Sequence, residues 1–131
     1  MACADALKRI SSITHGAVTF ESPVSGEIQE NCGFLENRPG TRKAACISLD
    51  TYGLTANAEW EEFSTPIVRG TSATLTYTLE QYDGGTNTVA ILRMRAGAVK
   101  FDFNSSPAFR QGQNFVYDSA SSDDFAPISV G

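Results

Sequence analysis

The chain has 131 residues, the size of a single domain that can bury a hydrophobic core of its own. Hydrophobic residues make up 41% of the sequence and charged residues only 19%, which excludes an intrinsically disordered chain and indicates a surface rich in uncharged polar groups. The net charge of −5 argues against a protein that grips the phosphate backbone of nucleic acids, because such proteins are usually basic.

The cysteines and the first residues indicate the compartment. Three cysteines are present, Cys3, Cys32 and Cys46, and an odd number does not close a disulfide framework. We expect reduced thiols in a protein made in the cytosol, with a Cys32–Cys46 bridge as an open alternative. Residues 1–10 lack the apolar segment of a secretory signal peptide, and no apolar run approaches the ~20 residues of a membrane-spanning helix, so we expect no membrane anchoring.

The first third of the chain combines an arm, a strand and a long loop. Residues 1–12 predict an N-terminal arm with a short helix candidate, which needs a docking surface because it is too short to be stable alone. Residues 13–21 predict the first strand. Residues 22–42 hold two prolines and three glycines and predict an irregular loop, within which a short strand over residues 26–31 stays open. Such a long loop in a small domain is usually functional or ordered by a partner.

The middle of the chain holds a strand and an ambiguous segment. Residues 43–52 alternate apolar and polar side chains and predict a strand. Residues 55–63 fit a strand, because alternate positions are apolar, but Ala56, Trp60 and Phe63 also lie at helical spacing. We favour a short helix or an irregular turn here, with Trp60 as a core anchor.

The most regular pattern spans residues 70–103. Apolar residues alternate with threonines, Asp83-Gly84-Gly85 predicts a chain reversal, and two further alternating runs follow on either side of Gly97. We therefore expect an antiparallel β-meander that forms the core of a β-sandwich or β-barrel. The predicted core residues are Val18, Phe20, Ile47, Leu49, Trp60, Leu75, Tyr77, Leu79, Phe101 and Phe103.

A C-terminal tail over residues 119–131 completes the expected domain. Residues 119–124 are acidic and lack any apolar pattern, whereas residues 126–130 predict an edge strand or a segment that reaches a neighbouring subunit. The whole chain, residues 1–131, is thus expected to form one mainly β domain with one short helix, a long loop and terminal arms.

No cluster of residues predicts catalysis or metal binding. His15 is the single histidine and lies beside Gly16 at a strand start, so we expect it at the surface or at a sheet edge. The cysteines lack the CxxC spacing of zinc sites, and the turn at Asp83 holds too few acids for calcium. The carboxylates lie in polar segments rather than in the apolar setting of a catalytic acid. We expect no enzyme activity, no cofactor and no metal.

Positive charge gathers on one face of the predicted sheet. Arg93 and Arg95 alternate with apolar residues, and Lys100 adds to the same face. Cross-strand partners within the domain or acidic loops of a neighbouring subunit would both explain this pattern. The apolar side chains of the long loop also suit a partner better than solvent. The predicted intersubunit contacts are Ile28, Phe34, Leu35, Arg38, Arg42, Lys43, Arg93 and Arg95.

The arrangement resembles the phage tail-tube family and its relatives in contractile injection systems. The resemblance lies in a first strand at residues 17–20 after an arm, a Trp-containing segment at residues 58–63, the meander piece at residues 73–78 and a Pro-containing tail at residues 126–130. It implies a β-sandwich or β-barrel protomer with one flanking helix. It also implies hexameric rings that stack into a hollow tube.

The resemblance implies a structural virion protein, a self-assembling tail-tube subunit found in the virion and assembled in the host cytoplasm. Its expected partners are itself and other virion proteins, with DNA as a non-specific cargo that slides past an acidic lumen. Two alternatives stay open. One is a phage capsid decoration or tail-completion protein. The other is a ligand-binding β-sandwich module that uses Trp60 and Tyr52 as a stacking platform.

Overall fold

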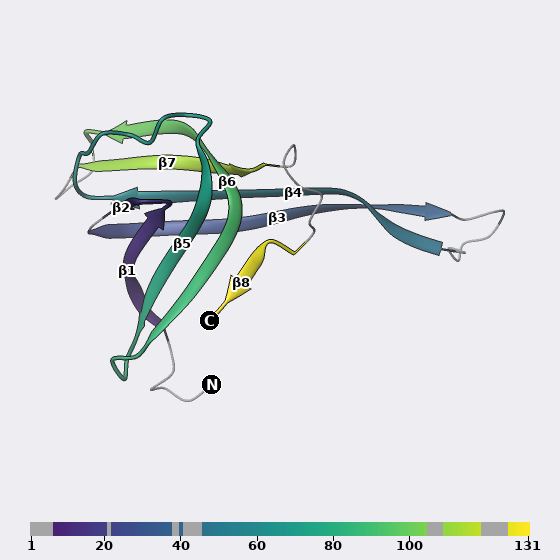
Figure 1. Ribbon diagram of the computed structural model, residues 1–131, viewed down its shortest axis with the longest axis horizontal. Helices are drawn as coiled ribbons and strands as arrows, with labels where there is room; N and C mark the ends of the chain where they lie inside the picture. The colour runs from purple at the N-terminus through teal and green to yellow at the C-terminus, as the bar shows by residue number, and fades with distance from the viewer. Residues whose placement is uncertain (1–6, 21, 38–39, 41–45, 105–108, 119–125) are drawn as a thin grey trace.

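The computed structural model describes residues 7–20, 22–37, 40, 46–104, 109–118 and 126–131. Within these residues the chain forms eight β-strands and no helix (Figure 1). The strands are β1 (Leu7–His15), β2 (Val18–Phe20), β3 (Pro23–Asn37), β4 (Cys46–Trp60), β5 (Ser72–Gln81), β6 (Thr86–Asp102), β7 (Arg110–Tyr117) and β8 (Ile128–Val130).

All eight strands belong to one antiparallel sheet. The strand order is β2-β1-β5-β6-β7-β4-β3, and β8 pairs with β6 beside this path. The mainly β prediction is confirmed. The sheet is not closed, because β2 and β3 stand at its two ends, so a closed barrel is not formed by the described part of one chain.

The predicted meander is present, with one difference. The reversal at residues 83–85 lies where the sequence places it, between β5 and β6, and Gly84 has a φ of 88°. The two runs that Gly97 was expected to separate form the single strand β6. Gly97 marks a register shift between β6 and β7 instead of a strand end, because a bulge absorbs an extra residue without ending the pairing.

A second bulge bends β6 and divides the sheet into two halves. Two residues of β6, Leu92 and Arg93, stand opposite one residue of β5, and Arg93 has a φ of 58°. Before the bulge β6 pairs with β5 and β8; after it β6 pairs with β7, and with β5 only at Met94 and Arg95. Bulges sharpen the twist of a sheet, and β5 and the first half of β6 accordingly run across β3, β4 and β7 (Figure 1).

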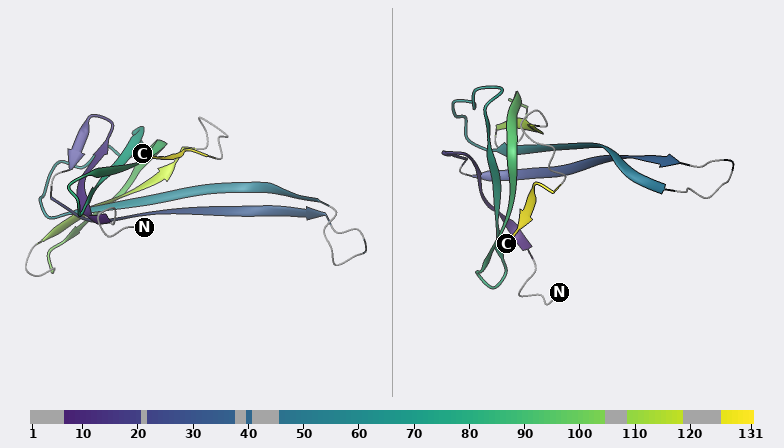
Figure 2. Two further views of the ribbon diagram at one scale, coloured as in Figure 1. Left: turned by 90° about the horizontal axis from the view of Figure 1, so that it is seen from below. Right: turned by 45° about the vertical axis from the view of Figure 1, so that its right-hand side comes forward.

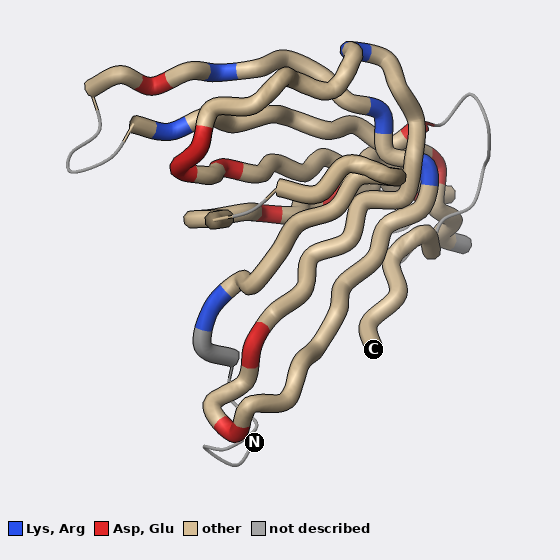
Figure 3. Tube along the Cα trace, turned by 60° about the vertical axis from the view of Figure 1, so that its left-hand side comes forward, with Lys and Arg blue, Asp and Glu red and all other residues tan. Residues whose placement is uncertain are grey.

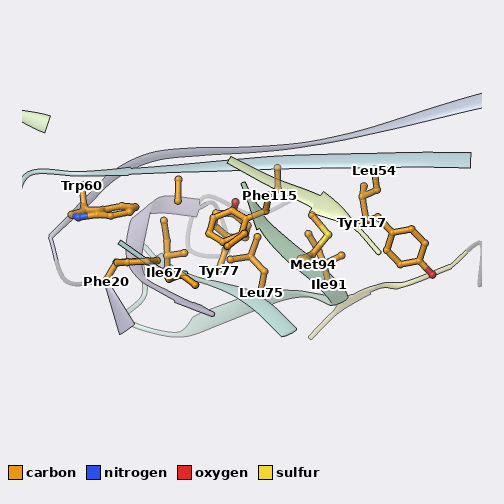
Figure 4. Close-up of a cluster of buried hydrophobic side chains, with 14 residues drawn as sticks. Phe20, Leu54, Trp60, Ile67, Leu75, Tyr77, Ile91, Met94, Phe115 and Tyr117 are labelled. Carbon is orange, nitrogen blue, oxygen red and sulfur yellow. The ribbon is translucent and has the colours of Figure 1, made fainter. Parts of the chain in front are cut away.

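The core lies between these two halves (Figure 4). Side chains from β4 and β7 meet side chains from β1, β2, β5 and β6, and Trp60 stacks on Phe20 with ring centroids 3.9 Å apart. Each fully buried large apolar side chain contributes about 1.5–3 kcal/mol. The buried hydrophobic residues are Ile13, Phe20, Leu54, Ala56, Ala58, Trp60, Ile67, Leu75, Tyr77, Ile91, Met94, Ala96, Phe115 and Tyr117.

The predicted core residues divide into buried, half-buried and exposed residues. Phe20, Trp60, Leu75 and Tyr77 are buried, and Leu79 packs partly buried against them. Leu49 is half-buried. The prediction is wrong for four residues, since alternation shows which side chains share a face but not whether that face is covered. These are Val18, Ile47, Phe101 and Phe103, with exposed fractions of 42%, 59%, 43% and 61%.

The predicted long loop and short helix are both wrong. Most of residues 22–42 forms β3, and the segment predicted as helix, residues 55–63, continues β4 up to Trp60. Glycine misled the loop prediction, because Gly26 provides room for a neighbour: a Cβ there would lie 2.6 Å from the Tyr77 ring. The Tyr77 hydroxyl crosses this gap and donates to the Asn57 carbonyl at 2.6 Å, which links the two halves of the sheet.

The predicted termini are partly strand. Leu7 to Ser12 of the expected arm belongs to β1, and the end of the expected tail forms β8 on β6. Residues 1–6 and 119–125 lie outside the described residues.

Candidate assembly surface

A long two-stranded ribbon projects from the body of the molecule. Strands β3 and β4 pair from Pro23 and Trp60 to Asn37 and Cys46. Within the described residues, β4 pairs with β7 only over Thr55 to Trp60, so the outer part of the hairpin has no third strand. Figure 2 shows the ribbon reaching far beyond the rest of the sheet. A two-stranded hairpin is marginally stable in water, which makes this ribbon a segment that a partner would stabilise.

The outer ribbon carries exposed apolar side chains. Phe34, Leu35 and Ile47 have exposed fractions of 62%, 61% and 59%. Exposed apolar groups of this size, gathered on one projecting element, are typical of interaction sites. We call Phe34, Leu35 and Ile47 the ribbon tip.

The ribbon strands are also purely acidic. Strands β3 and β4 carry Glu27, Glu30, Glu36, Asp50 and Glu59 and no lysine or arginine. The basic residues of the described part lie on β1, β6, β7 and the connection before β5 (Figure 3). The ribbon strands are thus acidic, whereas the rest of the described chain carries charges of both signs.

The residues predicted to contact other subunits have three different surroundings. Ile28 is half-buried and packs against the core, whereas Phe34 and Leu35 are exposed on the ribbon. Arg93 lies half-buried at the bulge of β6. Arg38, Arg42 and Lys43 lie outside the described residues.

Arg95 has partners inside its own chain. Its Nη2 lies 2.8 Å from Oδ2 of Asp118, whose side chain is 2% exposed, and its Nη1 donates to the Gly70 carbonyl at 2.7 Å. Of the two explanations that the sequence left open for this arginine, the structure shows an intrachain partner. Arg95 thus ties the start of β5, the middle of β6 and the end of β7 together.

The two residues considered for catalysis or ligand stacking, His15 and Trp60, are buried. His15 is buried, not exposed as expected; its Nε2 lies 2.7 Å from the Met94 carbonyl oxygen, and its ring centroid lies 5.0 Å from that of Phe115. Trp60 is 1% exposed and therefore does not offer the stacking platform of the ligand-binding alternative. Among the described residues, no group of His, Cys, Asp and Glu side chains could hold a metal ion.

The cysteines of the ribbon are not bridged. The register places Cys32 opposite Tyr52 and Cys46 opposite Asn37, so the two lie several residues apart along the ribbon. Cys32 is an exposed free thiol. In the part of the chain that the structure describes, no helix is long and apolar enough to cross a membrane.

The described strands define an all-β protein built on one bent antiparallel sheet with a projecting ribbon. Among solved structures, the chain is similar to one in the cryo-EM structure of the anti-feeding prophage cap, described as a tube terminating cap. The TM-score is 0.65 at 11% sequence identity, over 92% of this chain and 86% of the other. No protein-family model and no curated protein matches the sequence. The likeness is one of fold.

Proposed function

We propose that this protein is a non-enzymatic structural subunit of a phage-type tail or related injection particle, which assembles with copies of itself into a ring. The observation that carries the proposal is the projecting ribbon with its exposed apolar tip. The fold likeness to a prophage tube terminating cap supports the same class of role.

The open sheet explains how a ring would form. Strand β3 pairs only with β4 in the described residues, so its outer edge offers backbone donors and acceptors to another chain. Strand β2 ends the sheet on the other side. One chain leaves its sheet open. In the assembly, pairing between such edges of neighbouring protomers closes the sheet into a continuous β-wall, either a sandwich or a barrel. The hexameric symmetry expected from the tail-tube resemblance belongs to this proposal.

Docking of the ribbon tip supplies part of the energy of assembly. Full burial of a Phe, Leu or Ile side chain is worth about 1.5–3 kcal/mol, so three such residues outweigh a substantial part of the entropy lost on association. The acidic surface of the ribbon suits a wall past which DNA slides without sticking, since like charges repel. In this proposal the protein resides in the virion, is assembled in the host cytoplasm and contacts other virion proteins.

Two positions in a tail fit this description. A tube subunit stacks ring upon ring, whereas a tail-completion protein forms one ring at the end of a tube. Because the fold is similar to that of a tube terminating cap, we retain the tail-completion protein as a candidate beside the tube subunit. Both use the same ribbon and the same open edges.

Electron microscopy and light scattering of the purified protein test the proposal. We expect hollow rings, which grow into tubes if the protein is a tube subunit and stay single if it is a completion protein. The double variant Phe34→Ser/Leu35→Ser should weaken assembly at least 10-fold, because it removes apolar area at the contact. Tyr82→Ser, at the exposed β5–β6 turn, is the matched control and should assemble like the wild type. A wild-type protein that stays monomeric up to high concentration would contradict the proposal.

A further inference from the structure

The hydrophobic core opens to solvent between β1 and β3, two strands that do not pair with each other. A hollow of about 140 Å³ enters the core there, and we call it the core mouth. Ile10, Ile28 and Leu79 line it and are only partly buried against the core. The ring of Tyr77, which is 4% exposed, also lines it. One side of the core therefore presents apolar side chains to solvent.

A second hollow continues this opening along β3. It measures about 520 Å³ and shares Ile10 with the core mouth. Its other lining residues are Arg9 and Ser11 of β1, together with Ser22, Pro23 and Val24. The two hollows follow the chain from Ser22 to Ile28, one after the other. The opening thus has the elongated form that suits an extended chain segment better than a compact ligand.

The edge of β3 beside this opening has no strand partner among the described residues. Strand β3 pairs with β4 alone. Its first part, Pro23–Gln29, lies opposite Thr55–Trp60, the part of β4 that β7 supports from the other side. We call Pro23–Gln29 the body segment, to distinguish it from the projecting ribbon. Unpaired backbone groups on a supported strand form an acceptor site for a further strand.

The register determines where the side chains of an added strand would lie. Ile28 pairs with the buried Ala56 and faces the core, whereas Glu27 pairs with Asn57 and faces outward. Side chains of adjacent strands alternate between the same two faces. Every second side chain of the added strand would therefore enter the core mouth, and the others would lie beside Glu27.

We propose that the body segment binds an extended strand of a different protein, with aliphatic side chains at alternate positions and lysine or arginine between them. The aliphatic side chains complete the core. A basic side chain meets the exposed Glu27, because β3 and β4 carry acids and no base. This inference goes beyond the proposed ring, since it concerns another partner and leaves β3 from Glu30 to Asn37 to the neighbouring copy.

The strands of a second copy fit this site less well. Strands β2 and β8 are three residues long and uncharged, and the unpaired edges of β3 and β4 carry acids that would face Glu27. In β1, register shifts on both sides of Arg9 and Ile10 interrupt the alternation. At the end of β6, Asp102 offsets the charge of Lys100. A strand of a different protein satisfies both the apolar core mouth and the acid beside it.

Binding of a synthetic strand to the full-length protein tests the proposal. The probe is the end-capped peptide Lys-Val-Lys-Ile-Lys-Val-Lys, and the matched control is Glu-Val-Glu-Ile-Glu-Val-Glu, which has the same apolar residues. Methyl NMR follows both titrations at a protein concentration below that of assembly. The basic peptide should shift the methyl signals of Ile10, Ile28, Leu79 and Val89 but not that of Ile91, which is 0% exposed. The acidic peptide should bind about 5-fold more weakly.

Two variants and a control locate the contact. Glu27→Lys changes an exposed residue and should reverse the preference between the two peptides. Ile28→Ser removes apolar area from the core mouth and should weaken binding of the basic peptide about 10-fold, with circular dichroism to verify folding. Glu36→Lys, at an exposed position of β3 outside the body segment, is the control and should leave the preference unchanged. If Ile28→Ser does not fold, the surface variant Glu27→Lys still decides.

Three results would overturn the inference. The first is the absence of a saturable shift with either peptide up to about 1 mM. The second is a preference that Glu27→Lys leaves unchanged. The third is a shift of the same four methyl signals when the wild type assembles without peptide, since a second copy would then occupy the site. Assembly of the wild type tests the proposed function separately, so either proposal can fail without the other.

Discussion

Arg93 shows how one residue shapes the sheet. Its φ of 58° is sterically unfavourable for any residue with a Cβ, and such a conformation persists only where the surroundings impose it. Here the Arg93 carbonyl accepts from the Asp118 amide at 2.8 Å, and the Leu92 amide donates to the Pro127 carbonyl at 3.2 Å. The segments that follow β7 and precede β8 thus hold the bulge. Alternation in the sequence gives no sign of this position, because Arg93 reads as an ordinary member of a strand.

Arg95 gives the first residue-scale prediction. Arg95→Met removes the ion pair with the buried Asp118 carboxylate and should lower the free energy of unfolding by about 2–3 kcal/mol, less than for a fully buried pair because Arg95 is half exposed. Urea denaturation at low protein concentration measures it. Lys100→Met, an exposed substitution on the same strand, is the control and should change stability by less than about 0.5 kcal/mol. If Arg95→Met impairs only assembly, Arg95 acts between subunits instead.

Tyr77 has a similar structural role. Its hydroxyl bridges the halves of the sheet through Asn57, and burial raises the pKa of this phenol above its ordinary value. The group therefore stays protonated and able to donate throughout the neutral range. Gly26 leaves the space that the Tyr77 ring occupies. The sequence placed Tyr77 in the core correctly but treated Gly26 as a loop residue, because a glycine's role in close packing depends on a neighbour far away in the chain.

At the scale of the element, the ribbon differs most from expectation. Residues 22–42 read as a loop because prolines and glycines are rare in strands, and β3 nevertheless pairs along its whole length with β4. Of the apolar side chains that made this segment unsuited to solvent, Phe34 and Leu35 are exposed, whereas Ile28 packs partly buried against the core. We therefore apply to the ribbon the hypothesis made for the predicted loop, that contact with a neighbouring subunit orders this segment.

Hydrogen exchange tests that idea directly. In the tip variant Phe34→Ser/Leu35→Ser, kept monomeric, amides of the outer ribbon should exchange rapidly, because a two-stranded hairpin with no third strand opens easily. In the assembled wild type the same amides should be protected at least 10-fold more strongly. Amides between β5 and β6 serve as the internal control and should be protected in both states. Full protection of the ribbon in the monomer would show that it needs no neighbour.

At the scale of the whole molecule, the sheet is bent over a core but left open. Open edges and exposed apolar side chains are costly for a protein that works alone. They are expected in a protein whose working form is an assembly.

Thermal stability should therefore depend on protein concentration. Assembly involves only the folded state, so mass action raises the melting temperature of the wild type, by roughly 5 °C per tenfold increase in concentration. The tip variant should show no such dependence. Differential scanning calorimetry over two decades of concentration measures both. A wild-type melting temperature that does not change with concentration would contradict assembly in this range.

The sequence by itself determined the class of fold and much of the core. Period-two alternation predicted strands at β5 and β6, the Asp83-Gly84-Gly85 reversal placed the turn between them, and Phe20, Trp60, Leu75 and Tyr77 are buried as expected. These features are local, and a short window of sequence contains them. The sequence predicts less of the candidate site: it indicates Phe34 and Leu35 as contacts, but it places Phe101 and Phe103 in the core.

Only the tertiary structure decided which faces are covered. Phe101 and Phe103 alternate as core residues do, yet they lie near the end of β6, where they remain exposed beside Phe63 and Phe109. Likewise, Gln111 and Gln113 are buried because a distant connection folds over them. Burial depends on where the sheet bends and on which remote segments meet. The alternation of a strand fixes only which side chains share a face.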